Sequence, residues 1–249
     1  GALLPPAITD GPAATARSGA GPVFVVEADE YAGNFDAYHP DIAILTSAEW
    51  DHPDVFADAE AVQAAFEAWL RGMPAGSTVI ANAADPGVRS IIGRLADTHL
   101  TILRYALVAP EASGDGASAA VADFAALIVG ESADGTTLEI LGHGTAARPM
   151  TVQLATAGRH NAANALAVAA TANALGLDAA AIVSGLSTFS GVGRRLERLG
   201  EAAGVVVYDD YAHHPTAIRE TLRAIRQREP GRPVWAVYEP LTFHRTAAL

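Results

Sequence analysis

The chain has 249 residues, of which 50% are hydrophobic and 18% charged, with a formal net charge of −12 and no cysteine. Its length allows one large domain or two smaller ones, and its composition is that of a folded, soluble protein. The negative charge argues against a nucleic-acid partner, because phosphate binding needs a basic stripe. No apolar run is long enough for membrane insertion. Without cysteine there is no disulfide or thiolate metal site, and a cytoplasmic location fits.

All 16 basic residues are arginine. A chain without lysine has no Walker-type phosphate loop, Schiff base or catalytic lysine of its own. The two ends suggest an internal segment of a longer protein. The chain starts at Gly1 without a signal-peptide pattern, and it stops at Leu249 where a helix begins.

Two apolar runs, residues 23–26 and Ile42–Leu45, predict buried strands, and acidic residues follow each of them. This pattern is typical of a parallel sheet with a site at the carboxyl ends of its strands. Glu27 follows the first strand and His52 follows the second. A carboxylate and an imidazole could hold a hard divalent cation beside a phosphate. The alternative is that His52 is structural.

The middle of the chain predicts helices and then a change of texture. Asp58 starts a helix with one apolar face, residues 78–80 form a strand, and Asp85 starts a second helix. Short runs between turn residues then predict antiparallel edge strands and hairpins. These runs are residues 101–107, 126–129, 136–141 and 150–154.

An alanine-rich helix follows Gly158 and ends near Leu175, and a second helix ends near Leu186. Asn161 and Asn164 share a face of the first turn. Carboxamides there could hydrogen-bond a purine edge, although Asn161 could instead be an N-cap. The pattern restarts after these helices, so we predict one domain over residues 1–187 and a second over 188–249.

The second domain starts with a strand at 205–207, a helix at 215–226 and a strand at 234–238. The fold class is therefore α/β: a mostly parallel central sheet flanked by helices with an antiparallel edge region, plus the start of a second, Rossmann-like α/β domain. The loop between that strand and helix is rich in ionisable groups. Asp209 and Asp210 could accept from ribose hydroxyls, and His213 and His214 could contact a carboxylate or assist proton transfer. The alternative is a solvated loop.

A glycine turn precedes the adjacent Arg194 and Arg195, which could clamp a phosphate. The alternative for these two arginines is that they form an exposed basic pair without a ligand.

Five stretches of the chain, taken together and in order, resemble the Mur ligase family, the ATP-dependent amide-forming enzymes of peptidoglycan synthesis. They are Glu27-Ala-Asp-Glu30, Glu49-Trp-Asp-His-Pro-Asp54, Gly158-Arg-His-Asn-Ala-Ala-Asn164, Phe189-Ser-Gly-Val-Gly-Arg-Arg195 and Asp209-Asp-Tyr-Ala-His-His-Pro-Thr216.

The resemblance implies a three-domain enzyme in which residues 1–187 are the central ATPase domain, lacking its phosphate loop, and 188–249 begin the C-terminal domain. It implies ATP and Mg²⁺ as cofactors, and it assigns residues by motif. The implied roles are metal binding for Glu27 and His52, ATP binding for Asn161, Asn164, Arg195 and Asp210, amino-acid binding for His213, His214 and Arg245, and catalysis for His213 and Arg195.

The implied partners are UDP-N-acetylmuramate and L-alanine, joined through an acyl phosphate. The open alternatives are a relative that attaches a short peptide in cell-wall recycling and a catalytically inactive scaffold. The family's lysine-containing phosphate loop is expected upstream, so this segment should not turn over alone. Leu241 and Thr242 replace polar residues that the resemblance predicts near the amino acid. The sequence does not give the oligomeric state.

Overall fold

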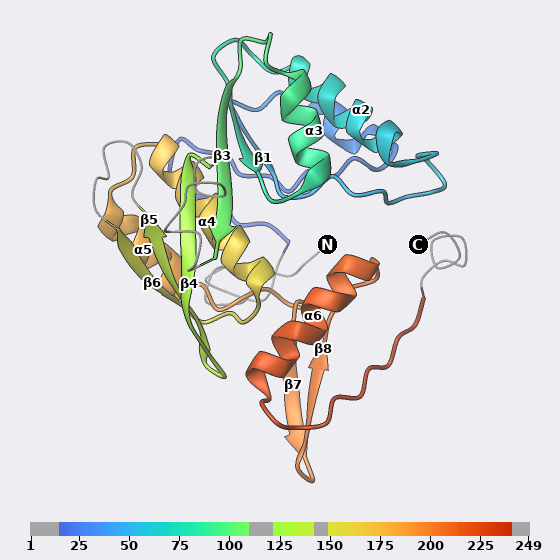
Figure 1. Ribbon diagram of the computed structural model, residues 1–249, viewed down its shortest axis with the longest axis vertical. Coiled ribbons are helices and arrows are strands. Elements are labelled where there is room, and N and C mark those ends of the chain that lie inside the picture. The colour runs from blue at the N-terminus through green and yellow to red at the C-terminus, as the bar shows by residue number, and fades with distance from the viewer. Residues whose placement is uncertain (1–14, 110–121, 142–148, 241–249) are drawn as a thin grey trace.

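The computed structural model describes residues 15–109, 122–141 and 149–240. Its centre is one six-stranded sheet whose spatial order follows the chain (Figure 1). The strands are β1 (Ile42–Leu45), β2 (Thr78–Asn82), β3 (Thr101–Val108), β4 (Phe124–Ser132), β5 (Gly135–Leu141) and β6 (Met150–Leu154). Strands β1 to β4 pair in parallel, and β4, β5 and β6 pair antiparallel. The expected mostly parallel sheet with an antiparallel edge is confirmed.

One detail of that prediction is wrong. Residues 101–107 were expected to form an antiparallel edge strand, but they lie within β3, which is parallel to both β2 and β4. A local run of apolar residues favours a strand but does not specify its neighbour. The sequence of residues 101–107 therefore could not show whether the strand pairs in parallel or antiparallel.

Helices cover both faces of the sheet. On one face lie α2 (Ala59–Arg71) and α3 (Pro86–Arg94). Asp58 and Asp85 cap these helices, because their carboxylates accept hydrogen bonds from the Ala61 and Val88 amides. On the other lie α4 (Arg159–Ala174) and α5 (Ala179–Thr188) (Figure 1). Successive residues of β2 alternate between the two cores. Val79 packs in the cluster of α2 and α3, and Ile80 in the cluster of α4 and α5. This alternation is the period-two pattern of a strand buried on both faces.

The second part of the chain contains a hairpin and a helix. Strands β7 (Glu197–Ala202) and β8 (Val205–Asp209) are antiparallel, and α6 (Pro215–Arg228) follows them. The turn residues Ala203 and Gly204 have φ values of 50° and 78°, as a tight hairpin requires. The expected strand at 205–207 is confirmed within β8, and the helix at 215–226 within α6. Strand β7, which is polar, was not predicted.

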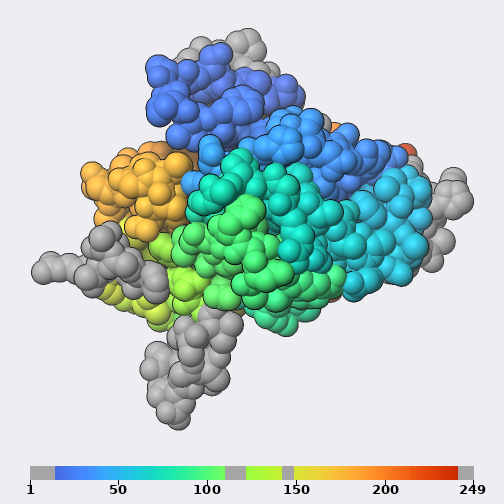
Figure 2. Space-filling view, turned by 90° about the horizontal axis from the view of Figure 1, so that it is seen from above, coloured from blue at the N-terminus to red at the C-terminus, as the bar shows by residue number. Residues whose placement is uncertain are grey.

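Two other predicted strands do not form. Residues 23–26 and 234–238 are extended without strand pairing, and Phe24 and Trp235 are 85% and 92% exposed. Both runs have strand-like composition, but a strand also needs a neighbouring backbone to accept its hydrogen bonds. The start of the described chain projects from the body of the molecule as the dark-blue segment of Figure 2.

Candidate functional site

The loop after β1 carries His52, and the next βα unit holds this loop in place. The Asn82 amide donates to the Thr46 carbonyl oxygen at 2.8 Å, and the Ala48 amide donates to the Asp85 carboxylate at 3.2 Å. A Cβ at Gly87 would overlap the Ala48 carbonyl oxygen. The first residues of the loop are therefore packed directly against the start of α3.

His52 itself sits at a tight turn with φ of 55°. Its carbonyl oxygen accepts from the Val55 and Phe56 amides at 2.8 and 2.9 Å. Its Nε2 lies 3.5 Å from a Glu30 carboxylate oxygen, and its ring lies 4.7 Å from that of Tyr31, centroid to centroid. The left-handed backbone of a non-glycine residue here is a local strain of the kind that gathers at functional sites.

The donors around His52 suit magnesium. Carboxylate oxygen is the hard ligand that Mg²⁺ prefers, and a borderline imidazole nitrogen can take one further position. Water and substrate oxygens then fill the rest of the octahedron. No group of three or more His, Asp or Glu side chains within the described residues could hold a metal ion by itself. The set fits a cation shared with a phosphate. Glu30 is the glutamate seen beside His52, whereas Glu27 lies in the exposed extended segment.

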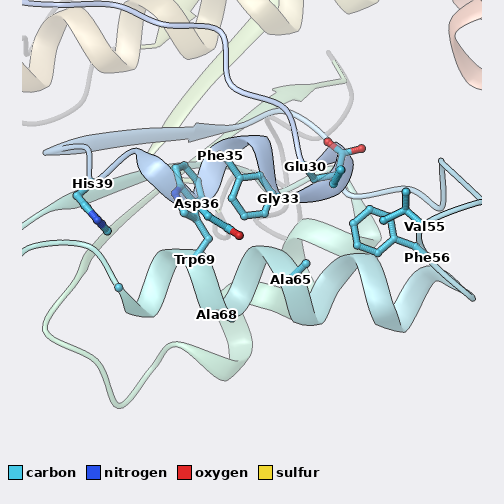
Figure 3. A pocket seen from close by; sticks show the side chains of 12 residues that line it. Glu30, Gly33, Phe35, Asp36, His39, Val55, Phe56, Ala65, Ala68 and Trp69 are labelled. Atoms are coloured by element: carbon cyan, nitrogen blue, oxygen red, sulfur yellow. The ribbon is translucent and has the colours of Figure 1, made fainter.

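A cavity of about 480 Å³ opens beside Glu30, between helix α2 and the 3-10 turn η1 (Tyr31–Ala37) (Figure 3). Phe35, Phe56 and Trp69 give it aromatic walls, and Glu30, Asp36 and His39 add polar groups. No pattern in the sequence predicted it, because its wall combines residues from three separate segments.

The second loop, residues 209–216, is shaped by Asp210. Its carboxylate accepts hydrogen bonds from the Leu196 and Ala212 amides, both at 2.7 Å, and from the Thr221 hydroxyl at 3.2 Å. Asp210 thus joins the end of the glycine turn, the loop and α6. This structural role exists whether or not a ribose also binds there.

Cationic and aromatic groups gather around Tyr211. The guanidinium groups of Arg194 and Arg195 lie 4.7 and 5.8 Å from its ring centroid, and the His213 ring lies 5.2 Å away. Both arginines are exposed. Stacking on an aromatic ring orients a guanidinium group while its N–H edge can bind an anion. The Arg194 Nε lies 3.6 Å from an Asp209 carboxylate oxygen, so part of that edge is already paired.

His214 joins the two loops. Its Nδ1 lies 3.2 Å from the Glu49 carboxylate, and its Nε2 lies 3.2 Å from the Trp50 carbonyl oxygen. The Thr216 hydroxyl donates to the same glutamate at 3.0 Å. The loop that bears His52 and the loop that bears Asp210 and His213 are therefore in direct contact.

The start of α4 completes the region. Its N-cap is Gly158, so the alternative that Asn161 is an N-cap is wrong. The Asn161 amide donates to the Ala157 carbonyl oxygen at 2.7 Å. Burial lowers the pKa of the neighbouring His160; the charges of Glu220 and Asp210 raise it, and Arg195 lowers it further. These charges act on His160 because α4, α6 and the Asp210 loop converge there.

Two family models match the chain: the Mur ligase middle domain over residues 14–172, and the glutamate ligase domain of Mur ligases over residues 194–247. The chain belongs to the Mur ligase family.

Relatives named UDP-N-acetylmuramate–L-alanine ligase are similar over almost the whole chain. That of Mycolicibacterium vanbaalenii is 39% identical over 93% of this chain and 47% of its own length. That of Kineococcus radiotolerans is 39% identical over 97% and 48%. The chain thus spans about half the length of the curated relatives it matches.

Solved Mur ligases have the same fold. A murein peptide ligase from Psychrobacter arcticus is 27% identical with a TM-score of 0.58, over 84% of this chain and 39% of that one. The alanine ligase MurC from Thermotoga maritima is 24% identical with a TM-score of 0.58, over 78% of this chain and 40% of its own. At that identity the similarity supports a shared fold and nothing more.

In this Mur ligase chain, the structure brings most of the predicted residues into one region. His52, His213, His214 and Asp210 are linked by the two touching loops, and Arg195 and Asn161 adjoin them through Tyr211 and His160. Asn164 is exposed on α4, and Arg245, Leu241 and Thr242 lie outside the described residues. Glu30, Glu49 and His160 lay inside the matched motifs but had been given no role. Their contacts depend on the fold, which the motifs alone do not show.

Among the described residues, no helix has the length and hydropathy needed to cross a bilayer.

Proposed function

We propose that the protein containing this chain joins L-alanine to UDP-N-acetylmuramate with the hydrolysis of ATP. The observation that carries the proposal is the contact of His214 with Glu49 and Trp50, because it unites the His52 loop with the loop of Asp210 and His213. The choice of alanine rests on the relatives at 36–40% identity that carry that name. We also propose a cytoplasmic location, where ATP is available, and a domain division at 187/188.

In this reaction the muramoyl carboxylate attacks the γ-phosphate of ATP, forming an acyl phosphate and ADP. The amine of alanine then attacks the acyl carbon, and the tetrahedral intermediate expels inorganic phosphate. Such chemistry depends on positioning and on stabilising charge, and it needs no protein nucleophile. Mg²⁺, held by His52 with Glu27 or Glu30, would offset the negative charge of the phosphoryl oxygens.

The chain's own residues have distinct parts. Arg194 and Arg195, oriented on Tyr211, would bind phosphate oxygens at their exposed edges. Asn161 uses one amide hydrogen for Ala157 and keeps its carbonyl oxygen and second hydrogen for a purine edge.

His213 is suited to accept a proton. Its Nδ1 lies 2.9 Å from the Tyr211 carbonyl oxygen, which can only accept, so Nδ1 carries the hydrogen in the neutral ring. The lone pair is then on Nε2. This nitrogen would take the proton that the amine of alanine loses when it attacks.

The test is phosphate release by the complete protein with ATP, Mg²⁺ and UDP-N-acetylmuramate. L-Alanine is compared with an L-Ala–D-Glu–diamino-acid tripeptide as the second substrate. Release that depends on alanine is the expected result. Release that depends on the tripeptide would reassign the protein to peptide recycling, and release with neither would favour a scaffold.

A further inference from the structure

The last turn of α6 carries one side chain that bonds to two separate segments of the central domain, the turn between β4 and β5 and the start of α4. The Gln227 amide nitrogen lies 3.2 Å from the Ser132 carbonyl oxygen, 2.9 Å from the Gly135 carbonyl oxygen and 3.1 Å from the Thr136 hydroxyl. Its carbonyl oxygen accepts from the Gly158 amide at 2.8 Å. Both ends of the carboxamide are therefore used.

The surroundings of Gln227 leave little freedom to shift. Gly158 has φ of 94°, and a Cβ there would come within 2.8 Å of the Ala224 Cβ on α6. Gly135 has φ of 147° and no room for a side chain against Leu154. Thr136 and Ala224 are fully buried. The backbones of the two domains therefore approach closely where Gln227 bonds them together.

Gln227 is connected to the candidate site in two ways, through its hydrogen bond to Gly158 and through the helix that carries it. Gly158, which it accepts from, is the N-cap of α4, three residues before Asn161. Helix α6, which carries it, begins directly after His213 and His214 and bonds to Asp210 through Thr221. A helix moves as a rigid rod, so a shift at its last turn displaces the loop at its first turn.

We propose that Gln227 is a positioning residue: it holds the start of α4 and the loop of Asp210 and His213 in one relative arrangement. Gln227 and Arg228, whose guanidinium donates to the Ala155 carbonyl oxygen at 2.6 Å, dock the last turn of α6, and His214 docks the first. The expected change in kcat rests on the proposed function. The docking of α6 by Gln227 does not. Only a carboxamide provides donors and an acceptor at this length, so glutamate and methionine of similar size both fail to reproduce the bonds.

The structural test measures a distance and needs no activity. The pair Asp134→Cys and Arg223→Cys, both at exposed positions, carries spin labels in the complete protein, in which any cysteine outside this chain is first replaced by serine. We expect a single narrow distance distribution. Gln227→Glu and Gln227→Met should broaden it, and the exposed neighbour Arg226→Ala should not. An unchanged distribution in both Gln227 variants would overturn the proposal.

The kinetic test uses the same variants without the cysteines. We expect Gln227→Glu to lower kcat by about tenfold or more and to raise the KM for ATP, because small displacements of aligned groups are costly. The KM for UDP-N-acetylmuramate should stay within about twofold of the parent. The rise in the KM for ATP is the result that loss of folded protein would not explain, because such a loss lowers kcat and leaves each KM unchanged. An unchanged kcat in a variant with a broadened distance would limit Gln227 to a structural role and overturn the positioning proposal.

The two proposals fail in different ways. If the parent releases no phosphate with any acceptor, the proposed ligase activity fails, and the distance measurement still decides whether Gln227 docks α6.

Discussion

His214 is the N-cap of α6, where its Nδ1 accepts from the Thr216 amide at 3.3 Å and its Nε2 can then donate to the Trp50 carbonyl oxygen at 3.2 Å. The Glu49 carboxylate also lies 3.2 Å from Nδ1. A single side chain thus carries most of the link between two loops that are far apart in sequence. A neutral hydrogen bond such as the one between Nε2 and the Trp50 carbonyl oxygen contributes roughly 0.5–1.5 kcal/mol, and proximity to the partly exposed Glu49 adds little. The importance of this residue lies more in where it holds the loops than in stability.

We expect His214→Ala to lower kcat in the complete protein by about tenfold, because the two loops lose their alignment. Glu49→Gln keeps an acceptor for the Thr216 hydroxyl and should have a smaller effect. Phosphate-release kinetics measure both, with thermal unfolding as the control for folding. A kcat in His214→Ala equal to that of the parent would contradict the role.

His160 predicts a pH dependence of stability. Burial lowers its pKa below the ordinary 6.5, and the carboxylates of Glu220 and Asp210 only partly oppose this effect, which Arg195 reinforces. The unfolded state then binds the proton more tightly than the folded state. The contribution of neutral His160 to the stability of the fold is therefore full above pH 6.5. It is lost as the pH falls through the lowered pKa that His160 has in the folded state.

The measurement is urea denaturation of the chain and of His160→Asn at several pH values between about 5 and 8. The parent should lose more unfolding free energy than the variant as the pH falls. The same slope in both proteins would show that His160 is not the group responsible.

At the scale of elements, two glycines of α3 make a matched pair. A Cβ at Gly87 would overlap the Ala48 backbone, whereas nothing lies within 4 Å of one at Gly93. Gly87→Ala should destabilise the chain by about 1–3 kcal/mol. Gly93→Ala should stabilise it by up to about 1 kcal/mol through helix propensity. Denaturant unfolding compares them, and equal effects would disprove the close contact between α3 and the His52 loop.

The elements also show how far sequence reasoning reaches. Aspartate caps and apolar periodicity predicted α2, α3 and α5, and β-branched runs predicted β1, β2 and β8. These signals are local. The strands expected at 23–26 and 234–238 have the same composition but no pairing neighbour, and the direction of β3 depends on its partners. Pairing is not local, so composition did not show it.

The candidate site divides in the same way. The motifs located His52, Asp210 and His213 on loops after strands. They could not show that Asp210 would bond to the Leu196 amide or that Glu30 would lie beside His52, because these contacts join distant segments. Motif spacing places residues along the chain, and tertiary packing decides which of them meet.

At the scale of the whole molecule, protection from protease should follow the two cores. Phe24 and Trp235 are exposed in extended segments, whereas Tyr105 and Phe124 are buried in the sheet. Exposed chain without regular hydrogen bonding is the preferred substrate of a protease. Brief chymotrypsin digestion of the chain, read by mass spectrometry, should cut after Phe24 and Trp235 first. Early cleavage at Tyr105 or Phe124 would contradict the arrangement.

Strand β4 is where the pairing in the sheet changes direction, since it is parallel to β3 and antiparallel to β5. Its bonds to β5 close over a short turn, while the parallel strands β1, β2 and β3 come together only across intervening helices or long connections. Short loops close with little entropy loss and hairpins form in microseconds, so contacts near in sequence form early. The meander of β4, β5 and β6 should therefore form first, and the parallel strands β1, β2 and β3 should assemble onto it later. In pulse-labelling hydrogen exchange, the amides shared by β4 and β5 would gain protection before those shared by β1 and β2.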